Sequence, residues 1–503
     1  MAIPGKTETV AKNTIIMYIR MFILMCVSFV SSRLLLQALG IEDYGIYSVV
    51  GSVSATFVAL KSLFSESIQR FLNFYKGKED IDKQREIFTL SIIIHLVLAI
   101  VLAIVLESVG TWLLLNKLVI PAEKVSTALF VFHTTVVASF ISVLCIPFDA
   151  LLIANERIGF YSIVSIFDGL FRLALVLILP HLPFILLKSY SLLLVVIPIV
   201  SLIAMLIYCR RLEECKLTRE INILLLKEVV ALSGWNFFGN ISFSLLHEGI
   251  NFILNIYGGL IYNASRSVAY QLKNLAVQFS SNSLIAARPM VMQSVTADDN
   301  YKSLFSNTIS ISRISFFIML LPITPILVYC KELLGIWLVE VPEYAPLFTR
   351  LVLLSVLFRS FHEPLNILHM SIGKIKRMMI IEVVIMISTL LLIYFMLSNG
   401  AEMWVSFALL ALMEVLIILS LSLNAKLEFG FPFRDFFKTA LLPATFLTVI
   451  MGAIIALFSL FSPGGIISVI AMCLPVLTMI CACIYLFLNE REKRLIKSLV
   501  FKH

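Results

Sequence analysis

Hydrophobic stretches long enough to cross a bilayer recur along this chain from Ile15 to Leu488, separated by short polar breaks. A helix needs about 20 predominantly apolar residues to cross the hydrocarbon layer. Fourteen windows meet this requirement, some with single charges inside them; they begin near Asn13, Tyr44, Phe88, Thr127, Tyr161, Leu186, Val229, Tyr262, Phe305, Ala345, Met378, Met403, Thr439 and Ile466. Inside the bilayer the backbone must bond within each segment, and the short alternating strands of a β-barrel are absent from the sequence. The sequence therefore predicts an all-α polytopic membrane protein with about 14 transmembrane helices.

The composition supports this fold class. Hydrophobic residues make up 60% of the chain and charged residues 14%, whereas a soluble domain is about 25% charged. The polar start, Met1 to Val10, lacks the pattern of a cleaved signal peptide, so we expect the first span to be retained. The eight cysteines lie mostly within spans and show no paired CxxC spacing. We therefore expect no cofactor and no metal site.

The basic residues predict the orientation, because Lys and Arg collect in cytoplasmic connections. With the N-terminus inside, the outer connections contain only Lys117, Lys124, Lys188 and Lys331, and all other connecting cations are cytoplasmic. This distribution predicts an even number of spans with both termini in the cytoplasm. The net charge of +8 then comes from basic connections that set the topology and contact the lipid bilayer. Because the chain has no basic domain, we expect no nucleic-acid partner.

The chain also repeats itself. Aligning Tyr44 with Tyr262 gives six identities over 31 positions, the other pairs being Gly40 with Gly258, Val50 with Val268, Ser62 with Ser280, Ser65 with Ser283 and Arg70 with Arg288. The offset of 218 residues contains six spans, so the two halves should have the same orientation, related by an axis along the membrane normal. We expect an N-lobe at 1–210 and a C-lobe at 211–425, of six helices each and facing a cavity, followed by two further helices at 426–503.

Four segments resemble oligosaccharide flippases, the O-antigen flippase type of polysaccharide biosynthesis protein. They are SRLLLQALGIEDYG at 32–45, QRFL at 69–72, GWNFFGN at 234–240 and ARP at 287–289. These flippases belong to the multidrug/oligosaccharidyl-lipid/polysaccharide exporter superfamily, and the resemblance extends over essentially the whole chain, including the fourteen spans.

The resemblance implies a MATE-like arrangement of two lobes in the bacterial cytoplasmic membrane. It implies that the protein moves a polyprenyl-pyrophosphate-linked glycan from the cytoplasmic to the outer leaflet, for assembly of O-antigen, capsule or exopolysaccharide. A polysaccharide polymerase and a chain-length regulator are the partner proteins that such a pathway implies.

Charged residues inside the spans are the candidates for binding such a cargo, because each is costly there and usually faces a cavity or a partner. Two sets, Asp168 with Arg172 and Arg359 with Glu363, lie four residues apart and can pair locally. The cations with no such local partner are Arg20, Arg33, Arg266, Lys273 and Arg313.

Span eight arranges two of these cations with two tyrosines on one helix face, at Tyr262, Arg266, Tyr270 and Lys273. Arg offers a fixed fork of donors and Lys a point charge, which together suit a diphosphate. Alternatively, Arg33 and Arg266, near the outer ends of their spans, extend to lipid headgroups.

Span seven has a second polar face, formed by Asn236, Asn240, Ser244, His247 and Asn251. These side chains could contact glycan hydroxyls or bind neighbouring helices. The predicted substrate-binding set is Arg20, Arg33, Arg266, Lys273, Arg313, Tyr270, Asn236 and Asn240. His247 and Glu248, with Asp168, are the candidates for ion coupling.

Two other functions are also compatible with the sequence. A multidrug cation antiporter of the same superfamily would have the same lobes, typically with twelve spans and with carboxylates for cationic drugs. A polytopic polymerase or ligase would usually present a large outer loop, and no nucleophile elbow, metal-ligand cluster or phosphate-binding glycine loop is found in the sequence. We therefore expect a transporter and not an enzyme.

Overall fold

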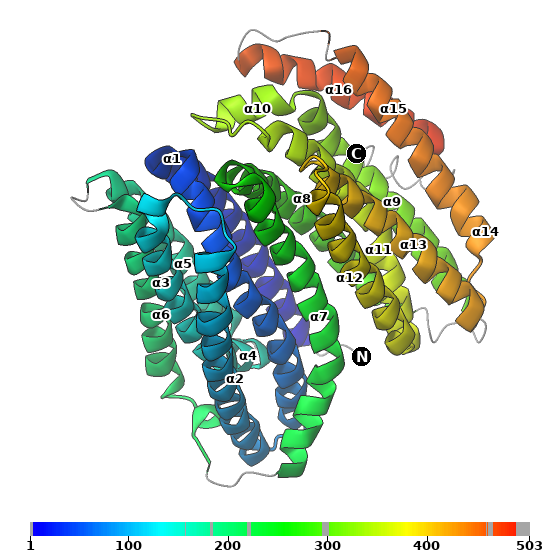
Figure 1. The fold of residues 1–503 in the computed structure, drawn as a ribbon. Coiled ribbons are helices and arrows are strands. Elements are labelled where there is room, and N and C mark those ends of the chain that lie inside the picture. Colours follow the sequence, from blue (N-terminus) through cyan, green and yellow to red (C-terminus); the bar gives the residue numbers. More distant parts are fainter. Residues whose placement is uncertain are drawn as a thin grey trace. The chain divides into compact units, whose positions relative to one another are not determined.

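The computed structural model describes residues 4–155, 157–181, 185–218, 223–293, 301–458, 460 and 466–488 (Figure 1). Within these residues the regular secondary structure is entirely helical and contains no strand. The chain divides into two compact units, Met1–Ala264 and Ser265–His503, and the division falls within α8 (Leu260–Gln293). The predicted lobe boundaries after residues 210 and 425 remain predictions.

The first unit is built around one very long helix. Its elements are α1 (Pro4–Gly77), α2 (Ile81–Asn116), α3 (Val125–Leu144), α4 (Ile146–Ala154), α5 (Ile158–Ile178), α6 (Leu186–Cys209), the 3-10 turn Glu213–Cys215 and α7 (Ile223–Gly258). Helix α1 contains the first two predicted spans and is kinked at Gly40, where φ is 75°. It packs against α3, α5 and α7, so it forms the centre of this unit.

The second unit is arranged around α9 and α11. Its elements after α8 are α9 (Lys302–Val328), α10 (Cys330–Trp337), α11 (Ala345–Ile372), α12 (Ile375–Ser398), α13 (Val405–Phe429), α14 (Phe433–Phe436), the π-helix Phe437–Leu441, α15 (Leu442–Phe458) and α16 (Ile466–Phe487). Helix α11 packs against both α9 and α13, while α15 and α16, the last two predicted spans, pack against α9. Between α11 and α13, the ring centroids of the buried side chains Phe348 and Phe407 lie 4.2 Å apart.

The helices agree with the predicted spans, since each of the fourteen predicted windows begins within a helix or, for Met403, two residues before one. Among the described residues, eleven helices are long and apolar enough to cross a membrane. Helix α8 is not among these eleven, because its described part contains the polar face predicted for span eight. The fold class is therefore an all-α polytopic membrane protein.

Two glycines near the start of the predicted repeat have a similar backbone conformation, with a shift of one residue. Gly40 and Gly259 have φ of 75° and 83°, so a left-handed glycine separates two helices in each half. Glycine has no Cβ and adopts this conformation without strain. The sequence alignment paired Gly40 with Gly258, whose neighbour Gly259 makes the equivalent break.

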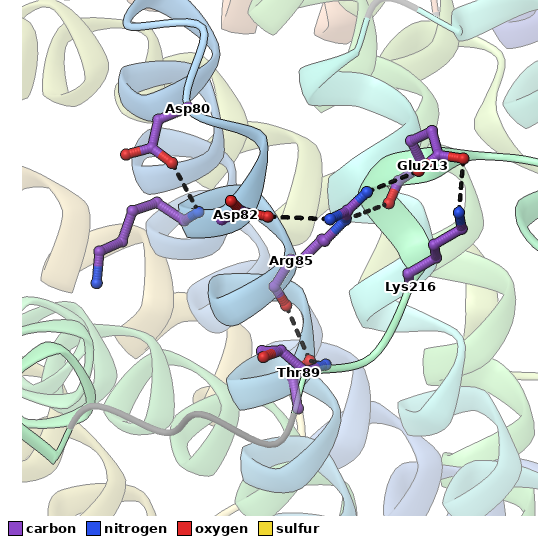
Figure 2. Close-up of polar contacts among 8 residues, drawn as sticks. Asp80, Asp82, Arg85, Thr89, Glu213 and Lys216 are labelled. Carbon is purple, nitrogen blue, oxygen red and sulfur yellow. Dashed lines mark hydrogen bonds and ion pairs between the residues drawn. The ribbon is translucent and has the colours of Figure 1, made fainter.

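A cluster of polar contacts fastens the segment after α6 to the start of α2 (Figure 2). Arg85 donates from Nε to the carbonyl oxygen of Glu213 at 2.9 Å and from Nη2 to the Glu213 carboxylate at 2.6 Å, and it also binds Asp82 at 2.9 Å. Lys216 donates to the same Glu213 carboxylate at 2.6 Å. This hydrogen bond, with Arg85 adding to it, lowers the pKa of the Glu213 carboxyl below its ordinary value.

Candidate functional site

Two buried cations on α8 share one tyrosine ring. The Arg266 guanidinium carbon lies 3.9 Å from the centroid of Tyr270, and the Lys273 ammonium nitrogen lies 4.5 Å from it. The two charges are therefore at most 8.4 Å apart, the sum of these distances, and the two residues are seven positions apart in sequence. Arg266 is 5% and Lys273 8% exposed. The predicted face of span eight thus concentrates positive charge, and the ring of Tyr270 contacts both cations.

Helices α11, α12 and α13 contribute a buried ionic network in the second unit. Arg359 on α11 pairs with Glu363 one turn away at 3.1 Å, as the spacing of four predicted. Its other amino group lies 3.5 Å from Oε1 of Glu414 on α13. Glu414 also lies within electrostatic range of Lys273 on α8.

His362 is the centre of that network. Its Nδ1 lies 3.1 Å from Oε2 of Glu414 and its Nε2 lies 2.9 Å from Oε1 of Glu382 on α12. The amide nitrogen of Asn366, one turn along α11, lies 3.2 Å from the same Nε2. The imidazole side chain is only 2% exposed, so water does not compete for these positions.

The geometry at His362 can accommodate an additional proton. A neutral imidazole has one N–H donor, and an ionised carboxylate has none. Both ring nitrogens face carboxylate oxygens, from Glu414 and Glu382, so both contacts are hydrogen bonds only if the ring is an imidazolium or one carboxyl is protonated. The arrangement can therefore hold one exchangeable proton inside a membrane-spanning bundle.

The first unit places polar groups around α5. The guanidinium of Arg20 on α1 lies 4.6 Å from the ring centroid of Tyr161. Farther along α5, Asp168 accepts a short hydrogen bond from the Ser201 hydroxyl of α6. Arg172, four residues after Asp168, interacts with it as the spacing predicted, and it also hydrogen-bonds Tyr47 of α1. Asp168 is thus part of a shared polar cluster.

The other predicted cations have different surroundings. Arg33 on α1 is exposed. Arg313 on α9 is buried, donates to the carbonyl oxygen of Thr439 at 3.3 Å and lies 5.8 Å from the ring centroid of Phe317.

The polar face of α7 is only partly described. Asn236 and Asn240 are helical, but their side chains lie outside the described residues. His247 is buried with its ring edge against Phe243, at a centroid distance of 4.3 Å. Glu248, its neighbour, is half-buried. The proposed ion-coupling roles of His247 and Glu248 remain predictions.

Farther along α7, asparagines bind helices together. Asn251 donates to the hydroxyl of Ser52 at 2.5 Å and to the carbonyl of Ser48 at 3.1 Å. Asn263, at the start of α8, donates to the side chain of Asn251 at 2.8 Å and accepts from Asn255 at 2.9 Å. All three asparagines are completely buried. These bonds favour the packing interpretation for Asn251, because its amide is used within the first unit.

No local pattern in the sequence indicates the role of His362. Its carboxylate partners come from two other helices, 20 and 52 residues away in sequence. Helical periodicity relates only residues one or two turns apart, as it did for Arg359 and Glu363. Among the described residues, no group of three or more His, Cys, Asp or Glu side chains could hold a metal ion.

No family model matches the chain, and no curated protein matches it in sequence. Solved structures do match it. The inward-facing structure of a multidrug resistance MATE family transporter of the MOP superfamily has a TM-score of 0.69 at 12% identity, and the match covers 84% of this chain and 99% of that one. This chain has the MATE fold.

Two further structures share this MATE fold. The outward-facing structure of a multidrug resistance MATE family transporter has a TM-score of 0.60 at 13% identity, covering 83% of this chain and 96% of that one. A MOP superfamily transporter from Pyrococcus furiosus, whose binding pocket is described as having reverse polarity, also has a TM-score of 0.60 at 13% identity, covering 82% and 95%.

Proposed function

We propose that this protein is a flippase that moves a polyprenyl-pyrophosphate-linked oligosaccharide from the cytoplasmic to the outer leaflet by alternating access. The observation that carries the proposal is the pair of buried cations, Arg266 and Lys273, held against Tyr270 on α8. The MATE fold supports a transporter. The four flippase-like sequence segments support a lipid-linked cargo.

The cation pair matches the part of the cargo that is hardest to move. A pyrophosphate cannot cross hydrocarbon unaided, because transferring an unpaired charge out of water costs many kcal/mol. Arg266 supplies a planar fork of donors and Lys273 a compact charge, both suited to phosphate oxygens. Stacking on Tyr270 holds the two cations near each other before an anion arrives, which reduces the ordering cost of binding.

A multidrug cation antiporter is the second candidate, and the three carboxylates Glu363, Glu382 and Glu414 favour it. Carboxylates within a bundle can bind a cationic drug. In the second unit, however, each of them already contacts Arg359 or His362. A drug cation would have to displace these partners, so we rank this function below the flippase.

We further propose that protons drive the transport through His362. The contacts around His362 join Arg359 to the three carboxylates Glu363, Glu382 and Glu414, so with a neutral imidazole this cluster has excess negative charge, which one added proton reduces. Binding or release of that proton changes the field at Lys273 through Glu414. Protonation at His362 and anion binding at Lys273 are thereby coupled electrostatically through Glu414.

The test is a leaflet assay in cells that lack the gene. We expect lipid-linked oligosaccharide to accumulate on the cytoplasmic face and the intact gene to reverse this. Lys273→Ala and Arg20→Ala should insert normally but fail to restore transport, whereas Lys331→Ala, at an exposed outer position, should restore it. Unchanged lipid-linked oligosaccharide together with altered sensitivity to cationic drugs would instead indicate the antiporter.

A further inference from the structure

A cationic cavity lies in the second unit, where α9 meets the chain after α13. Its volume is about 570 Å³. Helix α9 contributes the polar residues Lys302, Ser306, Ser310 and Arg313 together with Phe305 and Ile309, and the opposite wall includes Asp435 and Thr439. None of these residues belongs to the ionic network around His362.

The α9 side of the cavity is a polar face of a helix. Lys302, Ser306, Ser310 and Arg313 follow steps of four, four and three, so they form one stripe about 16 Å long. Helical side chains lean toward the N-terminus of their helix. Arg313 therefore leans toward Lys302, at the end of α9 that the charge distribution predicts to be cytoplasmic.

Arg313 is anchored so that it can also hold a ligand. It is 4% exposed and donates from Nη1 to the carbonyl oxygen of Thr439. Thr439 lies in the π-helix Phe437–Leu441, and such single π-turns occur frequently at functional sites. A guanidinium has five N–H donors, so it can hold both this carbonyl and an oxyanion.

The chemistry of the walls indicates the ligand. Two cations and two hydroxyls on one side suit a phosphate, and the Asp435 carboxylate on the other suits an amine donor. We propose that this cavity binds the phosphoethanolamine headgroup of a membrane lipid from the cytoplasmic leaflet. The phosphate contacts Lys302 and Arg313, and the amine contacts Asp435. This inference is independent of the transported cargo.

The test measures thermal unfolding of the purified full-length protein in detergent with short-chain lipids. Phosphatidylethanolamine should stabilise it more than phosphatidylcholine, whose quaternary amine has no N–H donor. The variant Lys302→Gln/Ser306→Ala changes only exposed positions and should weaken phosphatidylethanolamine binding by about tenfold or more, the loss expected for a hydrogen bond to a charged group. Asp435→Asn should remove the preference between the two lipids. Lys438→Gln, an exposed neighbour that does not line the cavity, should bind as the parent does.

Three results would overturn the proposal. Equal stabilisation by diacylglycerol would show that acyl chains alone are responsible. An equal effect of inorganic phosphate would show that the cavity holds a soluble anion. Unchanged phosphatidylethanolamine binding by Lys302→Gln/Ser306→Ala would place the lipid elsewhere on the protein.

Discussion

Nε2 of His362 lies 2.9 Å from Oε1 of Glu382, while the other ring nitrogen faces Glu414. One buried imidazole therefore joins α11, α12 and α13 through carboxylates. Removing one partner of a buried ion pair leaves the charge of the other partner unpaired. The loss of folding free energy is then larger than the stabilisation that the intact pair provides.

His362→Gln should accordingly destabilise the protein by roughly 3–5 kcal/mol, the range for breaking a buried ion pair. Adding Glu382→Gln should recover part of this loss, because it removes one of the carboxylates left without a partner. Thermal unfolding of the two single variants and the double variant measures the coupling. Strictly additive losses would mean that the two side chains do not interact.

The same network predicts how transport depends on the proton gradient. If His362 carries the driving proton, collapsing the proton gradient should slow transport by the parent protein. The His362→Gln variant should transport more slowly than the parent, and its rate should no longer depend on the proton gradient. Transport into vesicles with and without a protonophore measures this. A His247→Gln variant is the matched comparison, since its ring packs on Phe243 in the first unit. Loss of the gradient response in that variant alone would move the coupling site to α7.

Tyr270 provides a test of the cation pair that leaves both cations in place. Tyr270→Phe keeps an aromatic face for Arg266 and Lys273, so transport should stay close to the parent rate. Tyr270→Leu removes both contacts, each worth about 0.5–2 kcal/mol, and should reduce transport by about tenfold or more. A leaflet assay with matched expression compares them. Equal rates for Phe and Leu would show that the ring does not position the cations.

The sequence was sufficient to predict the helical fold, because each span is a local property of about 20 residues. It also predicted the face of Arg266, Tyr270 and Lys273 and the pair Arg359 with Glu363, because these residues lie within two turns of one helix. The contacts of His362 with Glu382 and Glu414 depend on how three helices pack. No periodicity within a helix contains that information.

The packing inside the first unit also could not be predicted from the sequence. Gly45 is an example. A Cβ added to Gly45 would lie 2.5 Å from the carbonyl oxygen of Leu260, closer than real Cβ contacts. Gly45→Ala should therefore force α1 and the start of α8 apart and destabilise the protein by about 1–3 kcal/mol. Gly51→Ala, six residues along the same helix, meets nothing within 4 Å and should be neutral or stabilising by up to about 1 kcal/mol. Equal unfolding temperatures for the two variants would contradict the close approach.

Arg85, near the start of α2, binds both the carboxylate and the carbonyl oxygen of Glu213 (Figure 2). The pKa of Glu213 is lowered, so its contribution to stability is present at neutral pH and is lost as the pH falls through that lowered value. After correction for intrinsic exchange rates, acidification should increase amide hydrogen exchange in residues 212–218, where the N–H of Lys216 bonds the Glu213 carbonyl. Glu213→Gln should exchange faster already at neutral pH and respond less to acid. Asp82→Asn is the control, because it removes only the most exposed partner of Arg85 and should exchange as the parent does. Faster exchange in Asp82→Asn than in Glu213→Gln would show that Asp82, and not Glu213, holds residues 212–218.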